Sequence, residues 1–250
     1  MRESKLLFPP QAYPGQELAE HLLETAKIAE KVVDENRLHL VLHHRLKVAS
    51  KYSAEKPQTE PEEIKRVYRI TALLHDIAKA ATIYQKSDQQ NRSYIYHEIP
   101  SALITQNYLE IQGIDHEVAT LASVAVLLHM SALRTPLDPM IMNKLQRRFK
   151  EGWNLAPYKE YLEEKLGLEN LPEKIEIKEI IDYLQFIDKY LRSRNRNHQK
   201  LYVLILAPII VGDNLSASRA RGGVFTGWRR MFMEELLKVL GEKYVKDKNL

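Results

Sequence analysis

The chain has 250 residues, of which 44% are hydrophobic and 28% charged, and its formal net charge is +4. An ordinary apolar fraction with only 9 glycines and 11 prolines excludes a disordered or collagen-like chain, and the absence of cysteine excludes a disulfide scaffold and any cysteine-ligated zinc or iron–sulfur site. The modest positive charge permits an anionic partner such as nucleic acid but does not require one.

Apolar residues recur every three or four positions along most of the chain, which predicts an all-α protein built as a helical bundle. The first helical segment is expected to break near residues 34–36. One segment, 117–133, is apolar on nearly every face and is expected to be a central buried helix. The predicted helices are, in chain order, 17–48, 62–86, 99–112, 117–133, 173–191 and 225–246.

The run at 201–211 is ambiguous. Its length and branched residues suit a strand, but Pro208 argues against a central strand because proline cannot donate to the ladder. We expect a helix from about Ile209 to Ala220. Residues 51–61 and 134–139 are expected to form loops.

No change in composition divides the chain, so residues 1–250 are expected to form a single domain. The apolar run at 201–211 is shorter than the ~20 residues that a membrane-spanning helix needs, and the first 15 residues lack the long apolar core of a signal peptide. We therefore expect no membrane partner and a cytoplasmic location. Abundant lysine and glutamate without cysteine indicate a thermophilic source.

The sequence LLHDIAK at 73–79 places His75 and Asp76 side by side within a predicted apolar helix. Because burial of an unpaired carboxylate is costly, Asp76 must meet a cation. That cation could be a metal ion, or it could be Lys79, one turn later. A purely structural cluster of these three residues therefore stays open.

Three further histidines lie beside or at the ends of apolar helical segments: His21, His97 and His129. A buried imidazole needs a partner, although each of these, taken singly, is more often a satisfied core residue than a metal ligand. The other five histidines stand in polar or basic stretches or at a helix start and are expected at the surface: His39, His43, His44, His116 and His198.

Asp213 is the second acidic residue of interest. It shares one helical face with Ser216, Ala217 and Ala220, and these small residues would let another helix approach closely. Asp213 would then be pressed against a partner such as the helix of His75 and Asp76. The alternative is an acidic residue near a helix N-terminus that interacts with the helix dipole.

The ordered set of these residues resembles the HD superfamily of metal-dependent phosphohydrolases. Four stretches carry a narrower resemblance to the stand-alone HD nuclease of type I CRISPR interference: HDIAKA, YHEIPSALI, LLH and GDNLSASRARGG. The likeness spans about residues 15–225. It implies the helical bundle of an HD domain.

By this resemblance the chain would bind one or two divalent ions, with manganese expected first and magnesium, nickel or cobalt as alternatives. Imidazole and carboxylate ligands suit such ions. Met130 stands where the family often has a second histidine, which would weaken the second site. The resemblance implies one ion held by His21, His75, Asp76 and Asp213, and a second held by Asp76, His97 and His129.

The resemblance also assigns roles in catalysis and DNA binding. Asp76 would be catalytic as the bridging ligand, and Lys79 would contact the scissile phosphate or reduce the build-up of charge. Arg219, Arg221 and Ser216 would bind nucleic acid near Asp213, since basic residues in this block suit a single-stranded phosphate backbone.

The leading hypothesis is a metal-dependent nuclease that cuts single-stranded DNA and acts with a separate helicase subunit and an RNA-guided surveillance complex. No Gly-Lys-Ser or Gly-Lys-Thr occurs, so the chain has no Walker-type phosphate loop of its own. Two alternatives stay open. One is an HD phosphohydrolase acting on a nucleotide or cyclic nucleotide, and the other is a non-catalytic, metal-binding adaptor for a helicase.

Overall fold

A computed structural model describes residues 8–49, 59–85, 93–130, 140–193 and 198–222. The predicted all-α class is confirmed, because the strands within these ranges form only two small two-stranded sheets, β1–β2 and β3–β4. In the first half the elements are β1 (Gln11–Tyr13), β2 (Gln16–Glu17), α1 (Leu18–Glu35), α2 (Leu38–Ala49), α3 (Pro61–Leu74), the 3-10 turn η2 (Ile77–Ala80), α4 (Thr82–Gln85), α5 (Glu98–Ile111) and α6 (His116–Leu128). In the second half they are α7 (Ile141–Arg148), β3 (Trp153–Asn154), η4 (Ala156–Tyr158), α8 (Lys159–Leu166), β4 (Lys174–Ile175), α9 (Ile177–Arg192), η5 (Gln199–Leu201) and α10 (Tyr202–Ala220).

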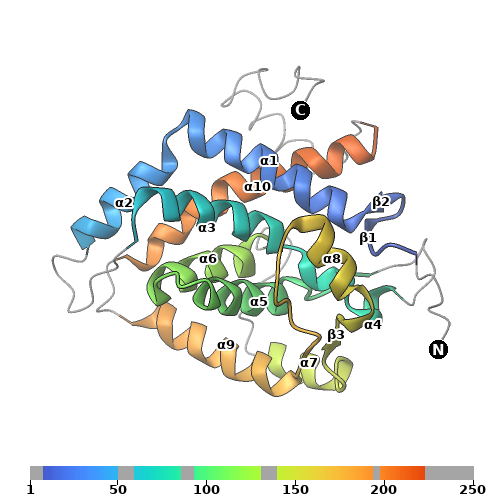
Figure 1. The fold of residues 1–250 in the computed structure, drawn as a ribbon. Coiled ribbons are helices and arrows are strands. Elements are labelled where there is room, and N and C mark those ends of the chain that lie inside the picture. Colours follow the sequence, from blue (N-terminus) through green and yellow to red (C-terminus); the bar gives the residue numbers. More distant parts are fainter. Residues whose placement is uncertain (1–7, 50–58, 86–92, 131–139, 194–197, 223–250) are drawn as a thin grey trace.

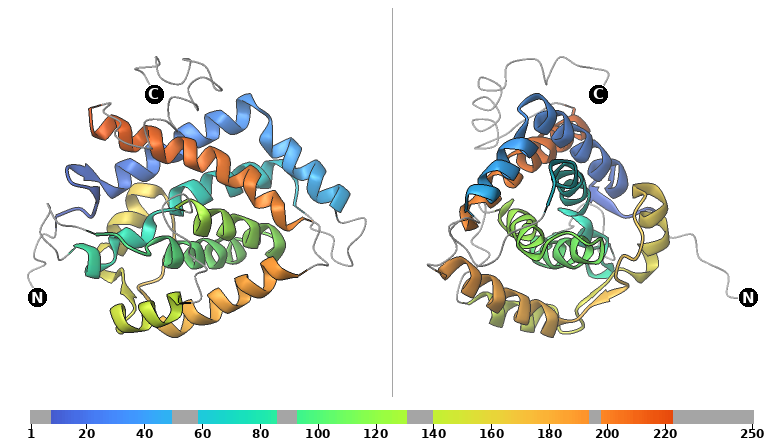
Figure 2. Two further views of the ribbon diagram at one scale, coloured as in Figure 1. Left: turned by 180° about the vertical axis from the view of Figure 1, so that it is seen from behind. Right: turned by 60° about the vertical axis from the view of Figure 1, so that its left-hand side comes forward.

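The helices α3, α5 and α6 lie at the centre of the bundle, and the other helices surround them (Figure 1). In the right-hand view of Figure 2, α1, α2 and α10 lie on one side of this centre, α7 and α9 on the opposite side, and α8 closes a third. The first and last described helices, α1 and α10, pack directly against each other. Helices from the two ends of the described chain therefore lie side by side in one layer.

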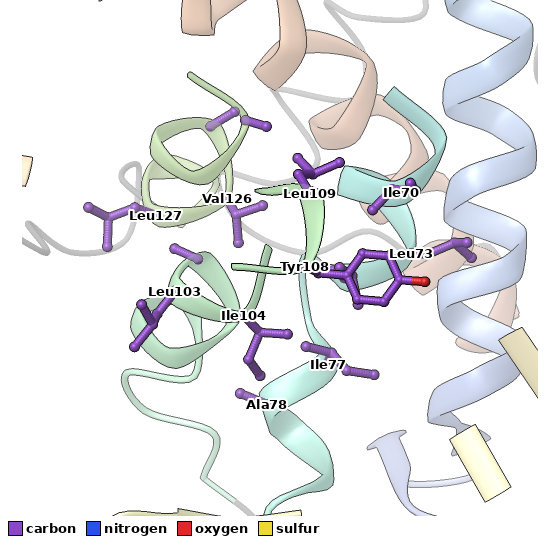
Figure 3. Close-up of a cluster of buried hydrophobic side chains, with 14 of the residues drawn as sticks. Ile70, Leu73, Ile77, Ala78, Leu103, Ile104, Tyr108, Leu109, Val126 and Leu127 are labelled. Carbon is purple, nitrogen blue, oxygen red and sulfur yellow. The ribbon is translucent and has the colours of Figure 1, made fainter. Parts of the chain in front are cut away.

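The core between α3, α5 and α6 is built from aliphatic side chains and one tyrosine (Figure 3). As expected from its apolar faces, α6 is buried along its length after its first residue, and it ends at Leu128. Val126 of this core is fully buried, and so is Ile77, the residue that follows Asp76. The candidate site is thus attached directly to the best-packed part of the protein.

Several helix boundaries differ from the predicted ones. The predicted helix 62–86 is broken at His75 and Asp76, which form a turn between α3 and η2. The imidazole of His75 accounts for the break: its Nδ1 donates to the carbonyl of Ala72 at 2.8 Å, the acceptor that a continuing helix would offer to the Asp76 N–H. The predicted helix 173–191 begins instead at Ile177, because the preceding residues pair in β4.

The ambiguous run at 201–211 is helical, and α10 begins at Tyr202 rather than near residue 209. Pro208 lies inside this helix and cannot donate to the carbonyl of Leu204. The hydroxyl of Tyr68 donates to that carbonyl instead, at 3.3 Å. A tertiary contact thus compensates for the missing backbone hydrogen bond and lets the helix continue.

The helical segment Gln199–Ala220 is long and apolar enough to cross a membrane by length and composition, which the shorter run 201–211 is not. Of its most apolar window, 56% is buried inside the protein, where it packs on α1 and α6. Such burial is typical of a core helix.

The remaining differences concern segments that carry weaker patterns. The helices α7 and α8 were not predicted, and two histidines expected at the surface are buried, His39 at 8% and His198 at 5% exposure. His198 lies 2.7 Å from a carboxylate oxygen of Glu117. The predicted helix 225–246 and the predicted loop 134–139 fall outside the described residues, as does most of the loop 51–61.

Candidate metal centre

The six candidate ligands come together from distant parts of the sequence, and most lie where a helix begins or ends. His75 and Asp76 follow α3, and His97 and His129 are the cap residues of α5 and α6. His21 and Asp213 lie within α1 and α10, which pack against each other. The side chains of the six are between 0% and 3% exposed except that of Asp213, which is 13% exposed. The cluster is therefore buried and is most open toward α10.

One group of four ligand atoms lies within 4.8 Å of one another: His21, His75, Asp76 and Asp213. The Nε2 of His21 lies 3.4 Å from Asp76 Oδ2 and 3.3 Å from Asp213 Oδ1. The Nε2 of His75 lies 3.5 Å and 3.8 Å from the same two oxygens. Two imidazoles and two carboxylates thus face one point.

A second group shares Asp76 and adds His97 and His129. Here the facing atom is the other carboxylate oxygen, Asp76 Oδ1, which lies 2.7 Å from His97 Nε2 and 3.3 Å from His129 Nε2. Asp76 therefore presents one oxygen to each group. Met130 follows His129 in the chain and is half-buried. Among the described residues, this stretch therefore contributes one histidine, His129, to the second group.

The four histidines are oriented alike, with Nδ1 directed away from the cluster and Nε2 toward it. The Nδ1 atoms of His75, His97 and His129 each contact the backbone carbonyl three residues earlier, at 2.8, 2.5 and 2.6 Å. Because a carbonyl only accepts, each Nδ1 must carry the proton, and each Nε2 is left with its lone pair. This is the arrangement of metal-ligating histidines, whose second ring nitrogen is held by an outer partner.

The atoms that face the cluster have no hydrogen-bond partner, although they are buried: the Nε2 atoms of His21, His75, His97 and His129 and the Oδ1 atoms of Asp76 and Asp213. Buried polar atoms are normally satisfied, and unpaired ones cost free energy. Imidazole and carboxylate are suitable ligands for divalent first-row ions. The residues therefore fit bound metal in both groups, and a divalent ion is the partner that these atoms lack.

The ionisation of the two acids suits this role. Burial raises the pKa of Asp76, but the charge of Lys79 and the adjacent imidazoles of His75 and His97 outweigh this effect and hold the pKa well below its usual range. Burial likewise raises the pKa of Asp213, but the adjacent imidazoles of His21 and His75 hold the pKa well below its usual range. Both side chains are thus carboxylates, as metal ligands must be.

The histidines differ in the direction of their shifts. Burial lowers the pKa of His97 more than the nearby Asp76 raises it. For His21, burial also lowers the pKa, but the adjacent carboxylates of Asp213 and Asp76 raise it by more, so its pKa lies above the usual value. In the metal-free protein, His21 therefore binds a second proton more strongly than His97 does.

Lys79 is buried beside the cluster, with Nζ 2.5 Å from Asp76 Oδ2. Burial lowers its pKa, but the charge of Asp76 and smaller contributions from Tyr13 and Asp213 raise the pKa above the usual value. Lys79 is therefore a fixed ammonium. Its Nζ also lies 4.6 Å from the ring centre of Tyr13, a cation–π distance.

The three residues predicted to bind nucleic acid lie in three different settings. Ser216 is fully buried, and its Oγ lies 3.0 Å from His21 Nδ1; its contact with DNA stays a prediction. Arg219 is 31% exposed and donates to Glu24 Oε1 at 2.7 Å. Arg221 lies with its guanidinium 4.5 Å from the ring centre of Tyr13. Two cations, those of Lys79 and Arg221, therefore contact one tyrosine beside the cluster.

Three residues that contact His21 or Ser216 were not predicted from the sequence: Tyr13, Gln16 and Glu24. Tyr13 packs edge-on against the ring of His21, and Gln16 and Glu24 both bond to Ser216. A signal for Glu24 was present, because it follows His21 by three residues and so shares its helical face. Tyr13 and Gln16 lie in β1 and β2, whose approach to α1 has no helical spacing to reveal it.

Comparison with known proteins gives concordant matches. A family model described as "Cas3, HD domain" matches residues 10–166. A protein of Saccharolobus solfataricus named CRISPR-associated endonuclease Cas3-HD is 29% identical over 244 residues, which cover 92% of this chain and 98% of the relative. A protein of the same name from Methanocaldococcus jannaschii is 25% identical over 234 residues, or 84% of this chain and 89% of the relative. Both organisms are thermophilic archaea, in keeping with the composition.

Among solved structures, the CRISPR-associated Cas3 HD domain protein from Methanocaldococcus jannaschii matches with a TM-score of 0.58. The match covers 81% of this chain and 100% of that chain at 21% identity. This likeness concerns the fold, and it agrees with the helical bundle described above.

Proposed function

Because the chain belongs to the Cas3 HD-domain family, it is a metal-dependent nuclease, and we propose that it cuts single-stranded DNA during CRISPR interference. The observation that carries the proposal is the buried meeting of four unpaired imidazole nitrogens with the carboxylates of Asp76 and Asp213. We assign His21, His75, Asp76 and Asp213 to one divalent ion and Asp76, His97 and His129 to a second. Manganese is the ion we propose, with magnesium, nickel or cobalt as alternatives.

Divalent ions held there would lower the pKa of a water molecule and stabilise the leaving oxygen of a phosphodiester. The protein's own part is to position charge. Asp76 directs one oxygen to each ligand group, and the ammonium of Lys79 lies beside it, where it can attract a phosphate oxygen. Asp213 is the most exposed ligand, so the substrate is expected to approach from its side.

Arg219 and Arg221 follow Asp213 on this same side. Arg219 lies six residues farther along α10, about 9 Å along the helix axis. A basic stretch beside an open ligand suits the phosphate backbone of a single strand. We therefore keep both arginines as proposed DNA-binding residues.

The partners that we propose are a separate helicase subunit and an RNA-guided surveillance complex. The sequence has no Gly-Lys-Ser or Gly-Lys-Thr with which to bind a nucleotide in a helicase motor. We also propose that residues 1–250 act as one cytoplasmic domain. In support, one cluster of buried side chains draws its members from Ala12 to Ile209.

The test is cleavage of circular single-stranded DNA with added manganese, because a circle has no ends and only internal cutting can open it. Wild type should linearise the circle. The Asp76→Ala variant should lose cleavage, since Asp76 belongs to both ligand groups. An Asp34→Ala variant is the matched control: this carboxylate is 57% exposed and pairs with Lys65 at the surface.

Retained cleavage by Asp76→Ala would contradict the proposed centre. If wild type binds manganese but cuts no DNA, the substrate is not single-stranded DNA. Turnover of a nucleotide or cyclic nucleotide would then identify a phosphohydrolase, and the absence of any turnover would identify a metal-binding adaptor.

A further inference from the structure

His21 is held differently from the other three ligand histidines. The Nδ1 atoms of His75, His97 and His129 contact backbone carbonyls, which can only accept a proton. The Nδ1 of His21 contacts a hydroxyl, Ser216 Oγ, at 3.0 Å. Because a hydroxyl can donate or accept, this contact alone does not decide which nitrogen of His21 carries the proton.

The other partners of Ser216 decide it. A serine hydroxyl has one proton to donate and two lone pairs with which to accept. Its proton goes to Glu24 Oε2 at 2.9 Å, since a carboxylate only accepts. The carbonyl of His21 is a competing acceptor at 3.5 Å, but the charge-assisted bond to the nearer carboxylate is the stronger. The two lone pairs then accept from Gln16 Nε2, at 3.2 Å, and from His21 Nδ1.

We propose that Glu24 is a positioning residue of the metal centre: by taking the proton of Ser216, it forces His21 to donate through Nδ1 and to present the lone pair of Nε2 to the ion. The inference rests on the metal centre proposed above. Arg219 fixes the Glu24 carboxylate from the other side, with its guanidinium 2.7 Å from Oε1. The ordered contacts run from Arg219 through Glu24 and Ser216 to His21.

Removal of Glu24 takes away the carboxylate that accepts the Ser216 proton. The Ser216 proton then has His21 as its nearest remaining acceptor, either at Nδ1 or at the carbonyl oxygen. Donation to Nδ1 moves the imidazole proton to Nε2, where it faces Asp76 and Asp213 and blocks the ion. Outer partners of ligand histidines typically contribute 10–100-fold to metal affinity.

The test is the affinity for manganese, measured by isothermal titration calorimetry on the full chain without DNA. Glu24→Ala should weaken the site that contains His21 by about 10–100-fold. Ser216→Ala should weaken it by a similar factor. Because the two residues act in series, the double variant should bind no more weakly than the weaker single variant, whereas independent structural effects would multiply.

Glu30→Ala is the matched control, because Glu30 lies on the same helix and also pairs with an arginine, Arg69, at 2.9 and 3.0 Å, away from the cluster. Its manganese affinity should equal that of wild type. Unchanged affinity in Glu24→Ala, or effects of Glu24→Ala and Ser216→Ala that multiply, would overturn the inference. If Ser216→Ala does not fold, comparison of Glu24→Ala with Glu30→Ala still decides.

Cleavage is not part of this measurement, so the two proposals can fail separately. A protein that binds manganese with the predicted pattern but cuts no DNA would retain the role of Glu24 and lose the nuclease assignment. A protein that cuts DNA but whose manganese affinity is unchanged in Glu24→Ala would keep the nuclease assignment and lose the role of Glu24.

Discussion

Asp76 is shared between the two ligand groups, and its two oxygens are used unequally. Oδ1 faces His97 and His129, whereas Oδ2 faces His21 and His75 and also contacts Lys79. Substitutions on the two sides of this carboxylate should therefore have separable effects on metal stoichiometry. Loss of Asp76 itself should affect both.

His129→Ala should reduce the manganese stoichiometry from two ions to one. His129 belongs to the group of Asp76 and His97 and not to the group that contains His21. Removal of a direct ligand should weaken the second site by at least the factor of about 10–100 found for outer partners. Calorimetric or atomic-absorption measurement of bound manganese checks this.

His116→Ala is the matched control for that prediction. It removes a histidine from the same helix, α6, but His116 is 55% exposed and pairs with Glu110. Its stoichiometry should remain two. Equal stoichiometry in His129→Ala and His116→Ala would remove His129 from the centre.

At the scale of helices, the ends of α3, α5 and α6 aim the ligands, and the packing of α1 on α10 completes the site. At Gly212 these two helices approach closely: a Cβ added there would lie 2.5 Å from the carbonyl oxygen of Thr25. The contact involves backbone, which a change of rotamer cannot relieve. It lies one residue before Asp213, so the ligand depends on this glycine.

Gly212→Ala should therefore lower stability and metal affinity together. Alanine favours a helix by roughly 0.5–1 kcal/mol over glycine, but overpacking typically costs about 1–3 kcal/mol, and the overpacking should prevail. Urea unfolding and manganese titration check the two effects. Val203→Ala, on a half-exposed position of the same helix, is the control and should change manganese affinity little.

The helices also show how much of the fold could be predicted from the sequence. The helices now seen as α1 and α5 were predicted close to their observed bounds, whereas α6, predicted as 117–133 from its apolar faces, ends earlier, at Leu128. The break after α3 was not predicted, because it depends on a side chain of His75 that takes a backbone carbonyl. The start of α10 was missed since Pro208 is tolerated only through Tyr68, which is 136 residues away from Leu204 in sequence. Periodicity reports local preference and carries no information on such tertiary partners.

The candidate site was likewise predicted only in part. The residue types of all six ligands were identified through the family pattern, and the structure brings those six together. What fixes them was not predicted: Glu24 and Gln16 act through Ser216, whose burial only the packing of α10 on α1 reveals.

For the whole molecule, metal removal should lower the melting temperature. A ligand at 100 times its Kd stabilises the folded state by about 2.7 kcal/mol per site, and a chain of this size shifts by roughly 2–4 °C for each kcal/mol. A chelator should thus lower the Tm by roughly 5–10 °C per filled site. Differential scanning calorimetry with and without chelator measures this.

The Asp76→Ala variant provides the comparison for that experiment. Because Asp76 belongs to both groups, its Tm should respond little to chelator, whereas Asp34→Ala should respond like wild type. A chelator effect of equal size in Asp76→Ala would place the stabilising ion elsewhere.

The pairing of α1 with α10 also bears on how the protein is made. His21 and Ser216 are 195 residues apart in sequence. At synthesis rates of about 5–20 residues per second, roughly 10–40 s separate the emergence of these two positions from the ribosome. During that interval the nascent chain gains the other three ligand histidines, His75, His97 and His129, one after another, and Asp213 follows last of the six ligands. The ligand group of His21, His75, Asp76 and Asp213 is therefore incomplete until α10 has been translated.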